Sequence, residues 1–99
     1  MTLKETVERV LENRPETRNN DVTLTVWVWH SLRPDLFRRI DGDSYIRTKD
    51  LYELPREDNV KRLRAQIQND EGRFLPTDPE VIKLRRRREE RWRDVINTV

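Results

Sequence analysis

The segment from Thr48 to Pro76 constrains the fold of this chain more than any other. Within it Val60, Leu63 and Ile67 recur at i, i+3 and i+7, and this spacing predicts an amphipathic helix over about residues 56–69. The other faces of that helix carry polar and basic residues: Lys61, Arg62, Arg64, Gln66 and Gln68. Such a helix can lie on a hydrophobic core and still present cations to a polyanion.

Further elements are predicted on both sides of this helix. Thr48 is a candidate N-cap for a short helix over about residues 48–54, and Pro55 separates that helix from the basic one. On the other side, residues 70–72 can form a tight turn, followed by a returning strand or arm from Arg73 to Leu75. The order of helix, turn, basic helix and wing is that of a helix-turn-helix domain.

Composition limits this chain to a small hydrophobic core. Of its 99 residues 33% are hydrophobic and 40% are charged, so we expect one domain, with a helical core over residues 1–76 and a charged helix over residues 77–99. The absence of cysteine excludes disulfides and thiolate zinc sites. The first ten residues lack the apolar run of a signal peptide, and no stretch is long and apolar enough to span a membrane. We therefore expect a cytoplasmic protein without a membrane segment.

The N-terminal half contains simple local signals. Thr2 and Glu5 match a capping box at the start of a first helix that ends near Asn13. Residues 33–44 are expected to form a loop or a short helix that ends in the turn signal DGDS, with a brief strand at residues 45–46.

The segment VTLTVWVWHSL, residues 22–32, supports two interpretations. Apolar residues at every second position alternate with Thr and Trp, which is the pattern of a strand. Against this, Asn20 or Asp21 can cap a helix whose stripe recurs at i, i+3, i+4 and i+7 from Val22. In either case we expect at least one of Trp27 and Trp29 to anchor the core rather than to stack on nucleobases.

The C-terminal segment predicts a long, arginine-rich helix. Thr77 and Glu80 match a second capping box, with Pro79 tolerated in the first turn, and the helix is expected to run from Asp78 nearly to Val99. The stretch of residues 83–93 contains seven basic and two acidic residues. A narrow apolar face accompanies these charges: Val81, Leu84, Trp92, Val95 and Val99.

Taken together, these segments resemble a group of small phage and prophage proteins of mostly unassigned function. Their pattern reads PETRNxD, an apolar segment ending in Val-Trp, RxxRxIQNxxGx[FY]LPT and an Arg-rich helix. The matching positions are Pro15 to Asn19 with Asp21, Val28 with Trp29, Arg62 or Arg64, Ile67 to Asn69, Gly72, Phe74 to Thr77, and Val81. The resemblance implies a mainly α-helical domain of winged-helix or helix-turn-helix type, with a short β-wing, that contacts DNA in the host cytoplasm. It also favours a helix over residues 21–31.

Double-stranded DNA is the partner that these features predict. On the basic helix Asn59, Arg62 and Gln66 share one face, and these residue types pair with base edges in a major groove. Contacts to phosphates are expected from the flanking and downstream residues: Lys61, Arg64, Gln68, Arg73, Arg85, Arg86, Arg87, Arg91 and Arg93. The expected role is regulatory, or accessory to replication or packaging.

Other partners are open at this level. The same arginines can bind RNA, or they can form a salt-bridged surface helix through i, i+4 pairs such as Arg85 with Glu89. The main alternative function is a protein-interaction module that binds a host or phage protein through the Arg-rich helix, and the narrow apolar face can pair with its copy in a homodimer. We expect no enzyme, metal, cofactor or small-molecule ligand, since His30 has no partner at a metal or triad spacing and no phosphate loop is present.

Overall fold

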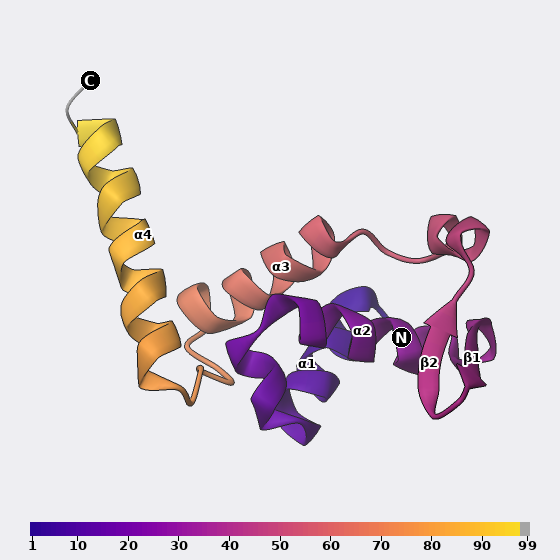
Figure 1. Ribbon diagram of the computed structural model, residues 1–99. Coiled ribbons are helices and arrows are strands. Elements are labelled where there is room, and N and C mark those ends of the chain that lie inside the picture. The colour runs from indigo at the N-terminus through magenta and orange to yellow at the C-terminus, as the bar shows by residue number, and fades with distance from the viewer. Residues whose placement is uncertain (98–99) are drawn as a thin grey trace.

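The computed structural model describes the backbone of residues 1–97 and the side chains of residues 1–88. The α-helices in this part are α1 (Leu3–Asn13), α2 (Asp21–Leu32), α3 (Glu57–Ala65) and α4 (Pro79–Asn97). The shorter helical segments are η1 (Pro15–Asn19), η2 (Pro34–Leu36), η3 (Thr48–Glu53) and the π-helical η4 (Gln66–Asp70). The strands β1 (Phe37–Ile40) and β2 (Asp43–Ile46) form an antiparallel hairpin between α2 and α3. The chain is therefore mainly α-helical with a β-hairpin (Figure 1).

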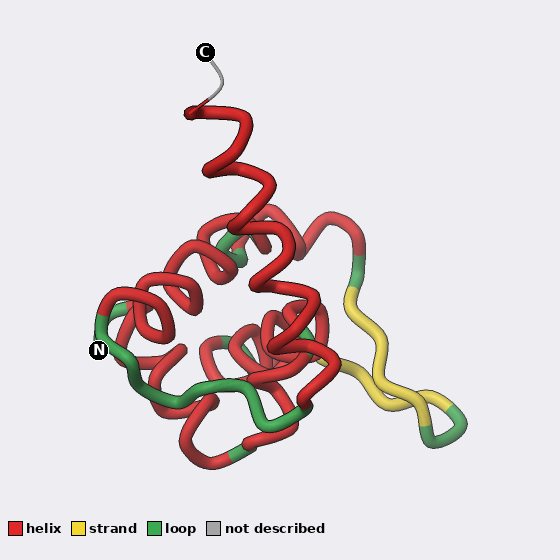
Figure 2. Tube along the Cα trace, turned by 90° about the vertical axis from the view of Figure 1, so that its left-hand side faces the viewer, coloured by secondary structure: helices red, strands yellow, loops and turns green. Residues whose placement is uncertain are grey.

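The helices α1, α2 and α3 pack against one another, whereas α4 and the hairpin project from them. In Figure 1, α4 and the hairpin lie on opposite sides of this three-helix core, and the molecule is 49 Å long in its largest dimension. Figure 2 shows the hairpin extending beyond the helices from a second direction. The structure thus presents two projections that are far apart.

Side-chain caps set the starts of α1 and α2. Thr2 Oγ1 accepts a hydrogen bond from Glu5 N at 3.2 Å, and Glu5 Oε1 accepts one from Thr2 N at 3.3 Å, which confirms the predicted capping box. The Thr2 hydroxyl also donates to Glu5 Oε1 at 3.0 Å, and this hydrogen bond, followed by the one from Thr2 N, lowers the pKa of the Glu5 carboxyl. At α2, Asn20 Oδ1 accepts from Val22 N at 2.9 Å and from Thr23 N at 3.1 Å. Both helices begin where the sequence places an oxygen to satisfy free N–H groups.

Residues 21–32 form a helix, and the burial of their side chains shows why the alternation was misleading. Leu24 and Val28 are fully buried, whereas Val22 is 62% exposed and Val26 is 43% exposed. A strand would place all four on one face, while a helix separates them into two. The helical interpretation is confirmed, but the apolar stripe predicted from Val22 is wrong, because the buried face runs through Leu24 and Val28 instead.

One apolar cluster joins the three helices and η4. Its buried members are Val7, Val10, Leu11, Leu24, Val28, Val60 and Ile67. Leu63 and Trp27 are partly buried against it, so the predicted stripe of α3 and the predicted tryptophan anchor are both confirmed. The side chain of Trp29 is held by a hydrogen bond, since its Nε1 donates to the carbonyl of Pro55 at 2.8 Å.

The hairpin turn follows directly from the sequence DGDS. Asp41 and Gly42 occupy the two turn positions, and both have positive φ, at 51° and 85°. This is the backbone geometry that Asp-Gly supplies in tight hairpins, and it sets Ile40 opposite Asp43. Residues 37–40, expected to lie in a loop or short helix, are therefore a strand, because the turn gives them a partner.

The elements beside α3 differ from the prediction. Residues 48–53 form a 3-10 helix without a side-chain cap, and Tyr52 on it is 89% exposed, so it is not the packed first helix of a helix-turn-helix unit. The expected wing at residues 73–75 is a loop, since Phe74 takes a φ of 48° that turns the chain before a strand can form. The hairpin that does exist precedes α3. In the described part of the chain, no helix is both long and apolar enough to cross a membrane.

Two truncations on α2 test the helical assignment. Leu24→Ala removes a fully buried side chain and is expected to lower the free energy of unfolding by about 2–5 kcal/mol. Val22→Ala, two residues earlier and exposed, is expected to change it by less than about 0.5 kcal/mol. Urea denaturation followed by circular dichroism measures both. Equal losses would contradict the helix, because only a strand buries the two residues alike.

Candidate nucleic-acid interface

The Asp21 carboxylate holds Arg64 inside the domain. Arg64 Nε donates to Asp21 Oδ1 at 2.8 Å and Arg64 Nη2 donates to Oδ2 at 3.0 Å, so the pair is bidentate. Arg64 is 9% exposed. It therefore does not lie on the outer face of α3, where the sequence had placed it as a phosphate contact. The reason is its spacing from Val60 and Ile67, at i+4 and i−3, which puts it on the buried stripe.

Arg85 connects α4 to the same carboxylate. Its Nη1 donates to the carbonyl of Arg18 at 3.0 Å and to Gln68 Oε1 at 3.1 Å, and its Nη2 lies 3.9 Å from Asp21 Oδ1. Burial, and then the nearby Arg64, lower the pKa of the Arg85 guanidinium. This arginine points toward the core, and its hydrogen bonds position the first turns of α4.

Gln68 joins this cluster to the loop after η4. It is 4% exposed, and its Nε2 donates to the carbonyl of Phe74 at 2.7 Å while its Oε1 accepts from Arg85. Arg18 and Arg73 approach the Phe74 ring, with guanidinium carbons 5.4 and 5.1 Å from the ring centroid. These contacts hold Phe74 in its left-handed backbone conformation, which a residue with a Cβ rarely adopts. Gln68 is thus structural, although the sequence suggested a phosphate contact.

Asn19 fixes the start of α4 from a distant part of the chain. Its Oδ1 accepts from Thr77 N and from Asp78 N, both at 3.0 Å, and its Nδ2 donates to Thr77 Oγ1 at 3.0 Å. Asp78 Oδ1 caps the helix by accepting from Glu80 N at 2.9 Å. The predicted capping box of Thr77 with Glu80 is therefore wrong. The Thr77 hydroxyl accepts a hydrogen bond from Asn19, and the side chain of Asp78 accepts the one from Glu80 N.

Arg73 is also engaged within the domain. Its guanidinium lies 3.2 Å from Glu8 Oε2 on α1 and 3.2 Å from Glu71 Oε1. Lys4 Nζ lies 2.7 Å from the other oxygen of Glu71, and this hydrogen bond lowers the pKa of the Glu71 carboxyl. Arg73 holds the loop against α1, so its charge is compensated by two carboxylates rather than presented on a wing.

Several of the residues that carry the phage-protein resemblance take part in these contacts. They are Arg18, Asn19, Asp21, Arg64, Gln68, Phe74 and Thr77. Among the described residues no buried polar side-chain atom lacks a hydrogen-bond partner. These residues therefore help to attach α4 to the core.

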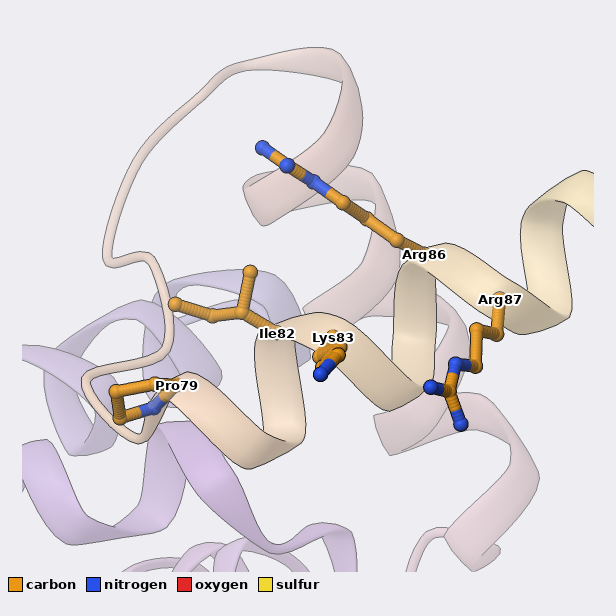
Figure 3. Close-up of a pocket in the computed structure, with 5 residues that line it drawn as sticks. All are labelled: Pro79, Ile82, Lys83, Arg86 and Arg87. Atoms are coloured by element: carbon orange, nitrogen blue, oxygen red, sulfur yellow. The ribbon is translucent and has the colours of Figure 1, made fainter.

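The cations left on the surface of α4 lie within three residues of Arg85 in the sequence. Lys83, Arg86, Arg87 and Arg88 are all exposed, and none forms an ion pair with another described side chain. Figure 3 shows Arg86 and Arg87 extending to different sides of the helix, with Lys83 between them. Between Pro79 and Arg88 the helix contains a single acidic residue, Glu80. This part of α4 is a strongly cationic surface.

The outer face of α3, together with the first residue of η4, carries the residues predicted to meet base edges. Asn59, Arg62 and Gln66 are exposed, as is the neighbouring Lys61. The spacing that placed them on one face away from the apolar stripe is confirmed by the burial of that stripe. The first turn of α3 is acidic, so this face is less cationic than that of α4.

Several predicted features lie outside the residues whose side chains are described. These are Arg91 and Arg93, the acidic Glu89 and Glu90 that could pair with the arginines, and the apolar residues Trp92, Val95 and Val99. Of the predicted apolar face, Val81 is partly buried and Leu84 is 51% exposed.

Comparisons with protein-family models, with curated proteins and with solved structures found no match for this chain. Over the described residues there is also no group of three or more histidines and carboxylates that could hold a metal ion. The interpretation of this surface therefore comes from its own geometry.

Neutralising Asp21 tests the central cluster. Asp21→Asn keeps the size of the side chain but leaves the charge of Arg64 uncompensated in a buried place, so we expect a loss of roughly 3 kcal/mol in unfolding free energy. Asp35→Asn is the control, because its pair with Arg33 is exposed and screened by solvent, and stability should stay almost unchanged. Urea denaturation measures the unfolding free energy of both variants. Similar losses would contradict a central role of Asp21 in holding the domain together.

Proposed function

We propose that this protein binds double-stranded DNA, and that the exposed cations of α4 contact its phosphates. The observation that carries the proposal is the division of the arginines on α4. Arg85 is turned inward by hydrogen bonds, while Lys83, Arg86, Arg87 and Arg88 stay on the surface of a helix that projects from the core. Attaching the helix through Arg85 leaves the other four cations available to a polyanion.

The length of α4 suits a contact along a DNA backbone. Its 19 residues correspond to roughly 28 Å at about 1.5 Å per residue. Four lysine or arginine contacts to phosphates release condensed counterions, and this release supplies a sequence-independent part of the affinity. The phosphate contacts would hold the protein on the duplex without selecting a sequence.

In this proposal α3 takes the part of the recognition helix of a helix-turn-helix or winged-helix protein. Its exposed Asn59 and Arg62, and Gln66 at the start of η4, are residue types that pair with adenine and guanine in the major groove. Together with the resemblance to phage proteins, this arrangement supports a regulatory role, or an accessory role in replication or packaging. Selectivity would come from α3 and most of the affinity from α4.

Charge reversal on α4 tests the phosphate contacts. With four contacts, the affinity of the natural protein for a labelled duplex should fall roughly a hundredfold between about 50 and 200 mM salt. Arg86→Glu with Arg87→Glu should weaken binding to all sequences and reduce the slope of log K against log salt by about 2. Fluorescence anisotropy measures both quantities.

The matched control makes the same charge change elsewhere. Arg38→Glu with Arg39→Glu alters two exposed arginines on the hairpin, away from α4, and should leave the salt slope unchanged. Absence of DNA binding by the natural protein at low salt would refute the proposal, and so would equal effects of the two double variants.

Substitutions on α3 test sequence reading separately. Binding sites are first selected from randomised duplexes, and Arg62→Ala with Gln66→Ala is then compared with the natural protein on the selected and on a random sequence. The variant should lose about 1–3 kcal/mol for each lost base contact on the selected sequence and almost nothing on the random one. If it weakens both sequences alike, α3 does not read bases.

A second candidate is protein binding through α4, and Leu84 favours it. This residue is 51% exposed on the projecting helix. Another part of the helix surface carries a shallow pocket that includes Pro79 and Ile82 (Figure 3). The partner would be a host or phage protein, or a second copy of the chain in a homodimer. Sedimentation equilibrium and nuclease-resistant binding to a defined partner, in the absence of salt-sensitive DNA binding, would distinguish this function.

A further inference from the structure

A groove between α2 and the β-hairpin stands apart from the surface assigned to DNA. It has a volume of about 640 Å³, and its walls include Val26 and Trp27 on α2, Pro34 in the connection, and Phe37 and Arg38 on β1. It lies on the hairpin side of the core, opposite α4 in Figure 1. This groove is independent of the residues used in the DNA proposal.

The floor of the groove is apolar, and part of it is open to solvent. Val26 is 43% exposed although it lies in the middle of α2, and Phe37 and Trp27 are only partly buried beside it. An isolated exposed valine is ordinary, but here it adjoins two aromatic rings in a concave place. The floor can therefore accept an aliphatic or aromatic side chain from a partner.

The rim of the groove is cationic. Arg38 and Arg39 line it, both are exposed, and neither forms an ion pair with a described side chain. Across the hairpin they lie opposite Tyr45 and Ser44, which are neutral. No Asp or Glu is among the described residues that line the groove. A partner that fills it meets positive charge at the edge and apolar surface at the base.

The aromatic rings of the groove are partly covered by neighbouring side chains, and this favours a peptide over a nucleobase as the ligand. The guanidinium of Arg14 lies 3.3 Å over the Trp27 ring, so one face of that ring is already covered. The His30 ring stands edge-on to Trp27 at 5.9 Å and tilted against Phe37 at 5.2 Å, which takes up further ring surface. An apolar side chain needs only contact area here, whereas a base needs an open face on which to stack.

We propose that this groove binds an acidic peptide segment of a partner protein, with an apolar side chain on Val26, Trp27 and Phe37 and carboxylates on Arg38 and Arg39. Such a segment satisfies both the apolar floor and the cationic rim. Because the groove and α4 lie on opposite sides of the core, one molecule can hold DNA at one end and an acidic protein segment at the other. The peptide site does not depend on DNA binding by α4.

Selection from a random dodecapeptide library displayed on phage tests the proposal with the full-length protein as the immobilised target. The enriched sequences should combine Asp or Glu with a large apolar residue. Fluorescence anisotropy with a labelled peptide from this set should show binding at least about tenfold weaker for Arg38→Glu with Arg39→Glu, since like charges then face each other. Arg86→Glu with Arg87→Glu should leave peptide binding unchanged.

A second pair of variants tests the floor without altering the hairpin. Val26→Glu places a carboxylate among the apolar groups of the groove and should also weaken the peptide at least about tenfold. Val22→Glu, one turn earlier on α2 and 62% exposed, does not line the groove and should have no effect. Circular dichroism confirms that each variant keeps its helices.

Three results would overturn the proposal. These are a failure to enrich any peptide, enriched peptides without acidic residues, and peptides that bind the hairpin and Val26 variants as tightly as the natural protein. Single-stranded oligothymidine that binds the natural protein and is lost in the Arg38 and Arg39 double variant would instead assign the groove to nucleic acid. DNA binding by α4 is measured on a duplex with separate variants, so either proposal can fail alone.

Discussion

The carboxylate of Asp21 holds three helices of this protein together. It lies in the first turn of α2, accepts two hydrogen bonds from Arg64 on α3, and forms a longer ion pair with Arg85 on α4. Charges are costly to bury unless their hydrogen-bonding groups are satisfied, and here the remaining groups are satisfied by Gln68 and by the carbonyl of Arg18. The position of α4 relative to the core depends on this cluster.

Because of this cluster, the arginines fall into a group with structural contacts and a group at the surface. Arg64 and Arg85 are held inside the domain, and the exposed Arg73 is paired with Glu8 and Glu71. By contrast, Arg86 to Arg88 on α4 and Arg38 with Arg39 on the hairpin lie at the surface without an ion pair to a described side chain. A net charge of +2 gives no sign of this division. These two groups of surface cations lie on opposite sides of the core, and this separation supports two binding surfaces instead of one.

The sequence predicted best those features that local interactions decide. The capping box of Thr2, the Asn20 cap and the stripe through Val60 are set by neighbours within one or two helical turns. The prediction of a wing was wrong because Gln68 holds the Phe74 carbonyl and two arginines lie against its ring, contacts that the local sequence pattern does not reveal. For the strand-like alternation of α2, only tertiary packing shows which valines are buried.

The candidate site was predictable in part for the same reason. Exposure of Asn59, Arg62 and Gln66 follows from helical spacing, and so does the inward position of Arg64 once its distance from Val60 and Ile67 is counted. Arg85 contacts Arg18, which lies 67 positions earlier in the sequence, and Gln68, which lies 17 positions earlier. Such pairings arise only when the chain has folded, as does the groove beside the hairpin.

The most direct test measures the NMR signals of individual arginine side chains as DNA is added. Two-dimensional NMR resolves individual arginine Nε–H groups, and a DNA duplex is added to the full-length protein in steps. The account predicts that the signals of Arg86 and Arg87 shift with added duplex while those of Arg64 and Arg85 stay in place. Shifts at Arg64 and Arg85, or none at Arg86 and Arg87, would contradict the division between structural arginines and those proposed to contact DNA.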